Sequence, residues 1–233
     1  MAIRLVALDA DDTLWHNETL FRLTQTRFND LLADYASPDV VGAKLIEIER
    51  RNLELYGYGA KGFTLSMIET ALEVSGAALP GSVLAEILAA GRSLMRHPIE
   101  TLPGVAEALE ALAGKADLVL VTKGDLFHQE QKLAASGLGN LFSGVEIVSE
   151  KTPDTYRRVF ARYGVDPAEA VMAGNSVRSD VLPPLEAGAH AALIPYPLVW
   201  VHEAASTPHG NPRFRELASL GELPAWIDTL NVG

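Results

Sequence analysis

The residues best suited to chemistry are three aspartates that follow a short apolar run near the start of the chain. Residues 5–8 are all apolar and lead directly into Asp9, Asp11 and Asp12. Carboxylates this close repel one another, and each raises the pKa of its neighbours unless positive charge lies among them. A solvated turn would account for them, because Asp is common in turns. A site for a divalent cation and a phosphate would account for them as well, because hard cations take oxygen ligands.

The elements that must position these aspartates alternate between strand and helix patterns. Short apolar runs at 4–8, 118–121, 145–148, 171–173 and 191–194 are expected strands. Helical patterns at 103–113 and 153–163 lie between the later strands. This alternation predicts an α/β fold, a Rossmann-like parallel sheet with helices on both faces. Ligands bind at the carboxyl ends of the strands in such a sheet.

The expected strand ends carry groups that complement the aspartates. These groups are two lysines, a hydroxyl, an amide and a further carboxylate: Lys123, Lys151, Thr122, Asn175 and Asp180. Oxygen ligands suit Mg²⁺, and cationic and hydrogen-bonding groups suit phosphoryl oxygens. The strand ends therefore indicate a site for a divalent cation and a phosphate.

Residues 15–102 interrupt the alternation with helical patterns alone, at 18–35, 38–56, 64–75 and 82–96. An all-helical block between the first two strands predicts an inserted helical domain. The expected division is 1–14 with 103–233 for the core and 15–102 for the insertion. Residues 195–212, rich in Pro and His, are expected to form an ordered loop.

Composition narrows the possible partners and locations. The 233 residues carry a net charge of -11, which argues against nucleic acid and anionic membranes as partners. The chain has no cysteine, which excludes disulfides and thiol catalysis and suits a reducing compartment. It shows no signal-peptide pattern and no apolar run as long as a membrane span. We expect a cytoplasmic protein; nothing in the sequence indicates an oligomeric state.

With these motifs in this order, the chain resembles the haloacid dehalogenase-like (HAD) hydrolases, in the phosphatase branch with a helical cap after the first strand. DADDTL at 9–14 is similar to the first motif of that family. The other three motifs resemble LVLVTKGD with Thr122, SEKTPDTY with Lys151, and GNSVRSD at 174–180. The resemblance covers essentially the whole chain and implies a Rossmann-like catalytic core with a helical cap.

The resemblance implies a Mg²⁺-dependent phosphatase that hydrolyses small phosphorylated metabolites through an aspartyl-phosphate. Asp9 would be the nucleophile, and Asp11 the general acid and base. That role needs a pKa near the working pH. Thr122, Lys123 and Lys151 would hold the phosphoryl oxygens. The implied Mg²⁺ ligands are Asp9, the backbone carbonyl of Asp11, Asn175 and Asp180. Asp12 and Thr13 are expected to tie the turn through side-chain to backbone hydrogen bonds.

One position departs from the family pattern. Asn175 stands where phosphatases of this type usually have Asp, so Asp180 is the only fourth-motif carboxylate in the expected place. An amide oxygen still binds hard cations but carries no charge. Weaker metal binding, direct metal coordination by Asp180, and an inactive phosphate-binding relative all remain open.

A second motif, at 57–62, fits the dinucleotide pattern G-x-G-x-x-G. It follows a charged helix rather than a strand, so a helix C-cap and a flexible loop are the favoured interpretation. In a cap, its Tyr58 and Lys61 could contact the substrate and set specificity.

The same residues bear on three alternative activities. A phosphomutase or phosphotransferase would keep every core motif. Haloacid dehalogenases lack an acid two residues after the first aspartate, so Asp11 argues against that activity. A receiver-type phosphoacceptor domain places its aspartate after an internal strand, whereas here it ends the first. Sugar phosphates, phosphoglycolate and nucleoside monophosphates all remain possible substrates.

Overall fold

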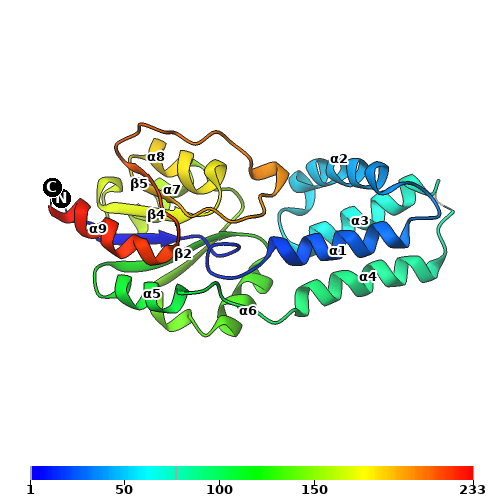
Figure 1. Cartoon of the computed structure of the whole chain (residues 1–233), viewed down its shortest axis with the longest axis horizontal. Helices are drawn as coiled ribbons and strands as arrows, with labels where there is room; N and C mark the ends of the chain where they lie inside the picture. The colour runs from blue at the N-terminus through cyan, green and yellow to red at the C-terminus, as the bar shows by residue number, and fades with distance from the viewer. Residues whose placement is uncertain (1, 77, 233) are drawn as a thin grey trace. The chain divides into compact units, whose positions relative to one another are not determined.

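The computed structural model describes residues 2–76 and 78–232. A parallel sheet forms the centre of one compact unit, which consists of Met1–Glu18, Ile99–Lys123 and Gln129–Gly233 (Figure 1). Its six strands are β1 (Leu5–Leu8), β2 (Asp117–Lys123), β3 (Gly144–Val148), β4 (Ala170–Gly174), β5 (His190–Leu193) and β6 (Phe214–Glu216). Their order across the sheet is β3-β2-β1-β4-β5-β6, and every neighbouring pair is parallel. The end of β1 therefore lies between the ends of β2 and β4.

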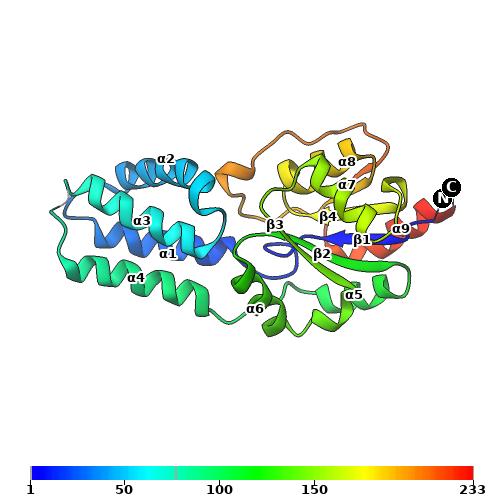
Figure 2. The ribbon, with the colours of Figure 1, turned by 180° about the vertical axis from the view of Figure 1, so that it is seen from behind.

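Helices cover both faces of the sheet, which confirms the predicted α/β fold. One face carries α5 (Val105–Ala113), α6 (Leu126–Ser136) and α9 (Leu223–Val232), and the other carries α7 (Pro153–Arg162) and α8 (Leu182–Ala187) (Figures 1 and 2). Successive strand side chains point to opposite faces. Val6 and Leu8 accordingly join the core beneath α5, whereas Leu5 and Ala7 join the core beneath α7. A strand buried on both faces must be apolar throughout, as β1 is.

Several elements of the sheet differ from the sequence-based expectation. The sequence predicts five strands, and the structure adds β6, a three-residue edge strand that ends in two exposed residues. It also adds α6, α8 and α9. The sequence of α6, LFHQEQKLAAS, is too polar to show a clear apolar face, so it does not predict a helix. The sequence of α8 does not predict one either, because it has prolines in its first turn. Residues 195–212 form a loop with one 3₁₀ turn, Val201–Glu203.

A second compact unit consists of Thr19–Pro98 together with Gly124–His128, and we call it the helical unit. Its long helices are α1 (Glu18–Leu31), α2 (Pro38–Tyr56), α3 (Ala60–Val74) and α4 (Gly81–Arg96). They bury a core of their own, which includes Phe28, Leu45, Met67 and Ile87. Each of these helices therefore buries an apolar stripe, which is the feature that the helical patterns at 15–102 indicate.

The G-x-G-x-x-G segment is a tight connection between two helices. Gly57 ends α2 with φ of 69°, and Gly59 precedes α3. The predicted flexible loop is wrong for its second half, because Ala60, Lys61 and Gly62 form the first turn of α3. A Cβ at Gly62 would lie 2.8 Å from the carbonyl oxygen of Gly57, so the close approach of the turn requires glycine.

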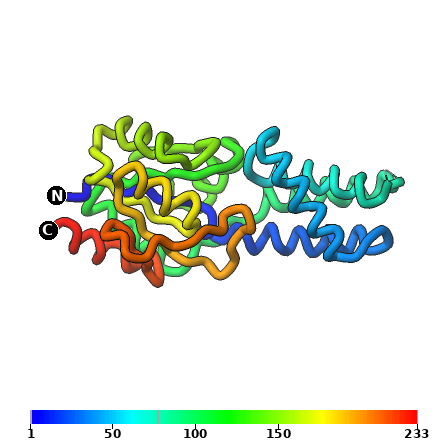
Figure 3. Tube along the Cα trace, turned by 90° about the horizontal axis from the view of Figure 1, so that it is seen from above, coloured from blue at the N-terminus to red at the C-terminus, as the bar shows by residue number. Residues whose placement is uncertain are grey.

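The two terminal segments lie side by side at the amino end of β1 (Figure 3). The backbone N–H of Ile3 donates to Oδ1 of Asn231, 2.6 Å away. This contact fixes α9 to the start of the central strand.

Across residues 2–76 and 78–232, no helix combines the length and the apolar character that crossing a bilayer requires.

Candidate active site

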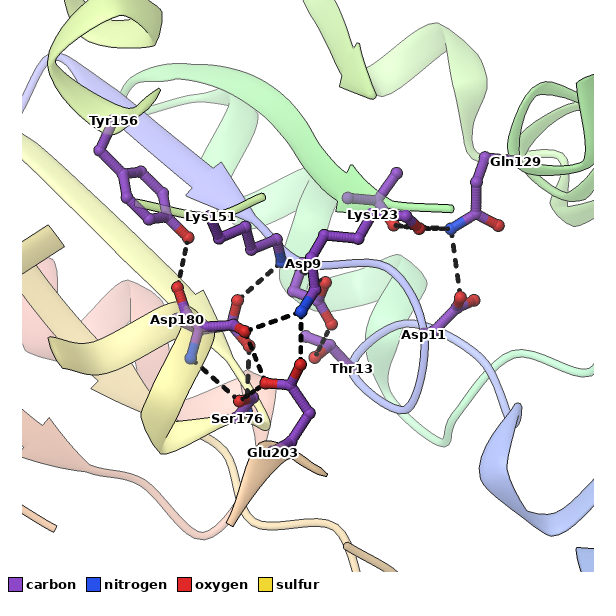
Figure 4. Close-up of polar contacts among 12 residues, drawn as sticks. Asp9, Asp11, Thr13, Lys123, Gln129, Lys151, Tyr156, Ser176, Asp180 and Glu203 are labelled. Atoms are coloured by element: carbon purple, nitrogen blue, oxygen red, sulfur yellow. Dashed lines mark hydrogen bonds and ion pairs between the residues drawn. The ribbon is translucent and has the colours of Figure 1, made fainter. Parts of the chain in front are cut away.

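Asp9 lies directly beyond the end of β1, where the sheet holds its backbone. Its N–H donates to the carbonyl of Ala173 in β4 at 2.9 Å. Its carboxylate accepts one hydrogen bond from the Thr13 hydroxyl at 3.0 Å and one from Lys151 Nζ at 2.5 Å (Figure 4). The side chain is therefore fixed at both oxygens at the predicted ligand-binding edge of the sheet.

Lys151 joins two buried carboxylates. Its Nζ lies 2.5 Å from Asp9 Oδ1 and 2.7 Å from Asp180 Oδ1, and its side chain is only 2% exposed. Burial raises the pKa of Asp9 to about 7; Lys151 works against this rise, and the charge of Asp180 adds to it. Burial lowers the pKa of Lys151, but the two carboxylates outweigh it and leave that pKa above its usual value. One ammonium group thus compensates two carboxylates only in part.

The turn after Asp9 is tied by Asp12, as predicted. The Asp12 carboxylate accepts the backbone N–H of Asn17 at 2.8 Å and of Glu18 at 3.0 Å. Asp12 has φ of 61°, a left-handed conformation that Asp tolerates better than most residues. Thr13 differs from the expectation, because its hydroxyl donates to the Asp9 carboxylate instead of bonding to backbone.

Asp11 is held by three donors. Its carboxylate accepts from Lys132 Nζ at 2.6 Å, Trp15 Nε1 at 2.7 Å and Gln129 Nε2 at 3.1 Å. Burial acts to raise the pKa of Asp11, but the charge of Lys132 and these hydrogen bonds outweigh burial and lower it. The expected pKa near the working pH is therefore absent in this conformation, because the donors stabilise the carboxylate form.

The second-motif residues lie at the end of β2. The buried Thr122 hydroxyl accepts a 2.6 Å hydrogen bond from Gln129 Nε2, which also reaches Asp11. Lys123 Nζ contacts Ser179 Oγ at 3.1 Å and forms an ion pair with Glu203. Thr122 is thus linked to Asp11 through one amide, whereas Lys123 is directed to the fourth-motif turn.

The fourth-motif turn packs Asp180 over the end of β4. A Cβ at Gly174 would lie 2.3 Å from Asp180 Oδ2, so the carboxylate occupies the space that a side chain would need. The N–H of Ser176 donates to the same oxygen at 3.0 Å. Residues Val177–Val181 continue as a π-helical turn, and Asn175 is half-buried beside Gly174.

The residues at this edge fit a hard cation in their chemistry. Among residues 2–76 and 78–232, no three His, Cys, Asp or Glu side chains are grouped so that they could hold a metal by themselves. The available donors are instead all oxygens: the Asp9 and Asp180 carboxylates, the Asp11 carbonyl and the Asn175 amide. Burial and the charge of Asp180 both disfavour ionised Asp9, as its raised pKa records, so further positive charge here would be stabilising. These donors suit Mg²⁺.

The two residues expected to set specificity lie in the helical unit. Lys61 Nζ is 2.9 Å from Asp125 Oδ2, and Tyr58 is half-buried. Asp125 comes two residues after Lys123 in the chain, so Lys61 contacts the segment that continues from the end of β2.

Sequence reasoning missed three polar residues of this edge, namely Gln129, Lys132 and Glu203. Gln129 and Lys132 are spaced to share one face of a helix, but α6 is itself not predicted. Glu203 comes from the loop at 195–212, where no local pattern indicates a half-buried carboxylate.

This geometry agrees with the comparison of the chain with known families. The model of the haloacid dehalogenase-like hydrolases matches residues 3–188, and the chain belongs to this family of hydrolases. The match includes all four motifs, from Asp9 to Asp180.

Individual relatives span a range of similarity. A haloacid dehalogenase-like family hydrolase from Xanthomonas campestris is 42% identical, with a TM-score of 0.90 over 99% of this chain and 93% of that one. N-acylneuraminate-9-phosphatase from Rattus norvegicus is 25% identical over 135 residues, 54% of this chain and 52% of the relative. The mouse enzyme is 26% identical over the same shares, so the chain matches about half the length of these curated relatives.

Two more distant structures share the fold. A 2-haloacid dehalogenase from Pseudomonas syringae is 22% identical, with a TM-score of 0.64 over 97% of this chain and 99% of that one. The HAD hydrolase YfnB from Bacillus subtilis, solved bound to magnesium, is 19% identical, with a TM-score of 0.68 over 98% of this chain and 100% of that one.

Proposed function

We propose that this HAD hydrolase is a Mg²⁺-dependent phosphatase that acts on small phosphorylated metabolites through an aspartyl-phosphate. The observation that carries the proposal is the placement of two aspartates at the end of β1. Asp9 is bound to Lys151, and Asp11, two residues later, belongs to a separate hydrogen-bond network. A hydrolase that forms and then breaks an acyl-phosphate needs a nucleophile and a distinct acid and base.

In the first half-reaction a carboxylate oxygen of Asp9 attacks phosphorus. The bond from phosphorus to the ester oxygen breaks, and Asp11 gives its proton to the departing alkoxide. Lys151 keeps Asp9 oriented and offsets the repulsion between its carboxylate and the phosphate dianion. Because Lys132 favours the charged form of Asp11, that contact has to weaken when the substrate binds.

In the second half-reaction water attacks the phosphorus of the aspartyl-phosphate. Asp11, now a carboxylate, takes the proton from water, the bond from phosphorus to Asp9 breaks, and inorganic phosphate leaves. The contact with Lys132 suits this step, since it stabilises the carboxylate. Thr122 hydrogen-bonds a phosphoryl oxygen throughout.

Bound Mg²⁺ would supply charge neutralisation for the nucleophile and the phosphoryl group. Asp9, the Asp11 carbonyl, Asn175 and Asp180 would hold it. The Bacillus subtilis hydrolase solved with magnesium shows that this fold can hold the ion, but at 19% identity it does not indicate which residues of this chain would bind it.

The names of the rat and mouse phosphatases support phosphate esters as substrates. The likeness to the Pseudomonas syringae dehalogenase is a likeness of fold alone, because it is only 22% identical. In this proposal residues 15–102 act as a cap domain on a core of 1–14 and 103–233. A closing cap favours small metabolites.

The test is a phosphate-release screen over a panel of phosphorylated metabolites, with Mg²⁺ and with EDTA. We expect Mg²⁺-dependent release from at least one small ester. Halide release from 2-haloacids would instead support a dehalogenase activity, and an isomeric phosphate ester as product would support a phosphomutase activity. A folded protein that binds phosphate but releases none from any ester would reject the phosphatase.

A further inference from the structure

Glu203 brings a carboxylate to the catalytic edge from a loop with no catalytic motif. Its side chain is 14% exposed. It forms an ion pair with Lys123 Nζ and accepts from the hydroxyl of Ser176 (Figure 4). It also accepts from the hydroxyl of Ser179. Lys123 belongs to the end of β2 and the two serines follow β4, so one carboxylate joins two strand ends.

The contact between Glu203 and Lys123 is a pair of charges. Burial alone would raise the pKa of Glu203, but Lys123 and the serine hydroxyls outweigh burial and lower it. The carboxylate is therefore ionised at neutral pH. The Lys123 side chain is 11% exposed, so water screens its charge little and the ion pair with Glu203 matters the more.

This pair directly adjoins the groups assigned to the phosphoryl site. Lys123 follows Thr122 in β2, and its ammonium also contacts Ser179, the neighbour of Asp180. Ser176, the second hydroxyl partner of Glu203, donates its backbone N–H to Asp180. A change at Glu203 would therefore alter both the charge and the position of groups around the phosphate.

We propose that Glu203 is a positioning residue that holds Lys123 in a neutral pair and thereby limits the affinity of the site for the phosphate product. The inference rests on the proposed phosphatase function. An ammonium on a flexible four-carbon stem turns to the nearest anion when its partner is removed. Without Glu203, the ammonium can turn to the bound phosphate. Product release sets the turnover of many enzymes, so a partner that weakens product binding aids the reaction.

The experiment measures the dissociation constant of inorganic phosphate by calorimetry, with Mg²⁺ and with EDTA. Glu203→Gln keeps the shape and one hydrogen-bond acceptor but removes the charge. We expect its dissociation constant to fall about tenfold, because an uncompensated charge then faces the dianion. The double variant Lys123→Met with Glu203→Gln should return close to the wild-type value. Glu216→Gln, at an exposed carboxylate in β6, is the matched control and should not differ from wild type.

Thermal unfolding and kinetics of p-nitrophenyl phosphate hydrolysis distinguish this role from a merely structural one. We expect Glu203→Gln to lower KM and kcat together, and we expect added phosphate to raise its melting temperature more than it raises that of the control. A folded Glu203→Gln variant that binds phosphate as wild type does, or more weakly, would overturn the inference but would not contradict the proposed phosphatase function. Wild-type protein that binds no phosphate under any condition would instead reject the proposed function.

Discussion

Lys151 Nζ lies 2.5 Å from Oδ1 of Asp9, although 142 residues separate them in the chain. The same ammonium lies 2.7 Å from Asp180. Because each oxygen of Asp9 already has one donor, its carboxylate is oriented before any substrate arrives. Such preorganisation is what a weak nucleophile facing a phosphate dianion requires.

Replacing Asp9 by Asn should abolish turnover while the fold persists. The amide has nearly the same shape but is not a nucleophile, so phosphate release should fall more than about a thousandfold. Circular dichroism should show a folded protein. Asp117→Asn is the control and should keep full activity, because Asp117 begins β2 whereas the proposed site lies at the other end of that strand. Wild-type rates in a folded Asp9→Asn variant would reject the covalent mechanism.

Replacing Asp11 by Asn should slow both half-reactions by about a hundredfold to ten-thousandfold, the usual contribution of a positioned acid and base. An activated ester such as p-nitrophenyl phosphate needs little help from an acid, so the aspartyl-phosphate should accumulate from it. Acid quenching followed by intact-mass spectrometry would detect the added phosphoryl group. If the variant turns over normally and retains no phosphoryl group, Asp11 is not the acid and base.

Replacing Tyr58 and Lys61 together by Ala should change the rank order of substrates. We expect the preferred metabolite to lose about tenfold or more in kcat/KM, because pocket contacts contribute on this scale. p-Nitrophenyl phosphate should be affected much less. Arg51→Ala is a matched control, since Arg51 and Lys61 have the same side-chain exposure of 53% and each pairs with a carboxylate. Equal losses on all substrates would indicate a folding role.

Replacing Asp180 by Ala should raise the Mg²⁺ concentration for half-maximal activity by about tenfold or more, because it removes a charged group of the proposed metal site. Excess metal should rescue activity only in part, since Lys151 also loses a partner. Asn175→Asp should lower the Mg²⁺ requirement modestly, because the added carboxylate attracts the ion but also repels Asp9. Activity that survives EDTA, or an Asp180→Ala titration identical to that of wild type, would reject this metal assignment.

Replacing Asp12 by Ala should lower the free energy of unfolding by about 1–2 kcal/mol, the usual cost of losing a capping side chain. Asp12 accepts the backbone N–H groups of Asn17 and of Glu18, the first residue of α1, and its positive φ disfavours Ala. Asp12→Asn keeps an acceptor and should cost less. Urea unfolding of both variants, with exposed Asp34→Ala as the control, measures the difference. Equal stabilities of the Ala variant and wild type would mean that these hydrogen bonds add nothing to stability.

The sequence by itself determined the sheet core and the order of the catalytic motifs. β1 is readable because a strand buried on both faces must be apolar, and Asp9 follows it immediately. In a parallel sheet all carboxyl ends lie at one edge, so Thr122 and Asp180 could be assigned to the same side as Asp9 from chain order alone. The short edge strand β6 and the polar helix α6 could not be recognised, because neither has a clear apolar period.

Only the tertiary structure decided which polar groups pair at that edge. Lys151 bridges Asp9 and Asp180, Lys132 pairs with Asp11, and Glu203 pairs with Lys123. Each pair joins residues far apart in sequence, and its geometry depends on how strands and helices pack rather than on any local pattern. The direction of each pKa shift follows from these partners and from burial. The acid and base role that the resemblance implies for Asp11 needs a pKa near the working pH, whereas Lys132 and the hydrogen bonds of this structure lower that pKa.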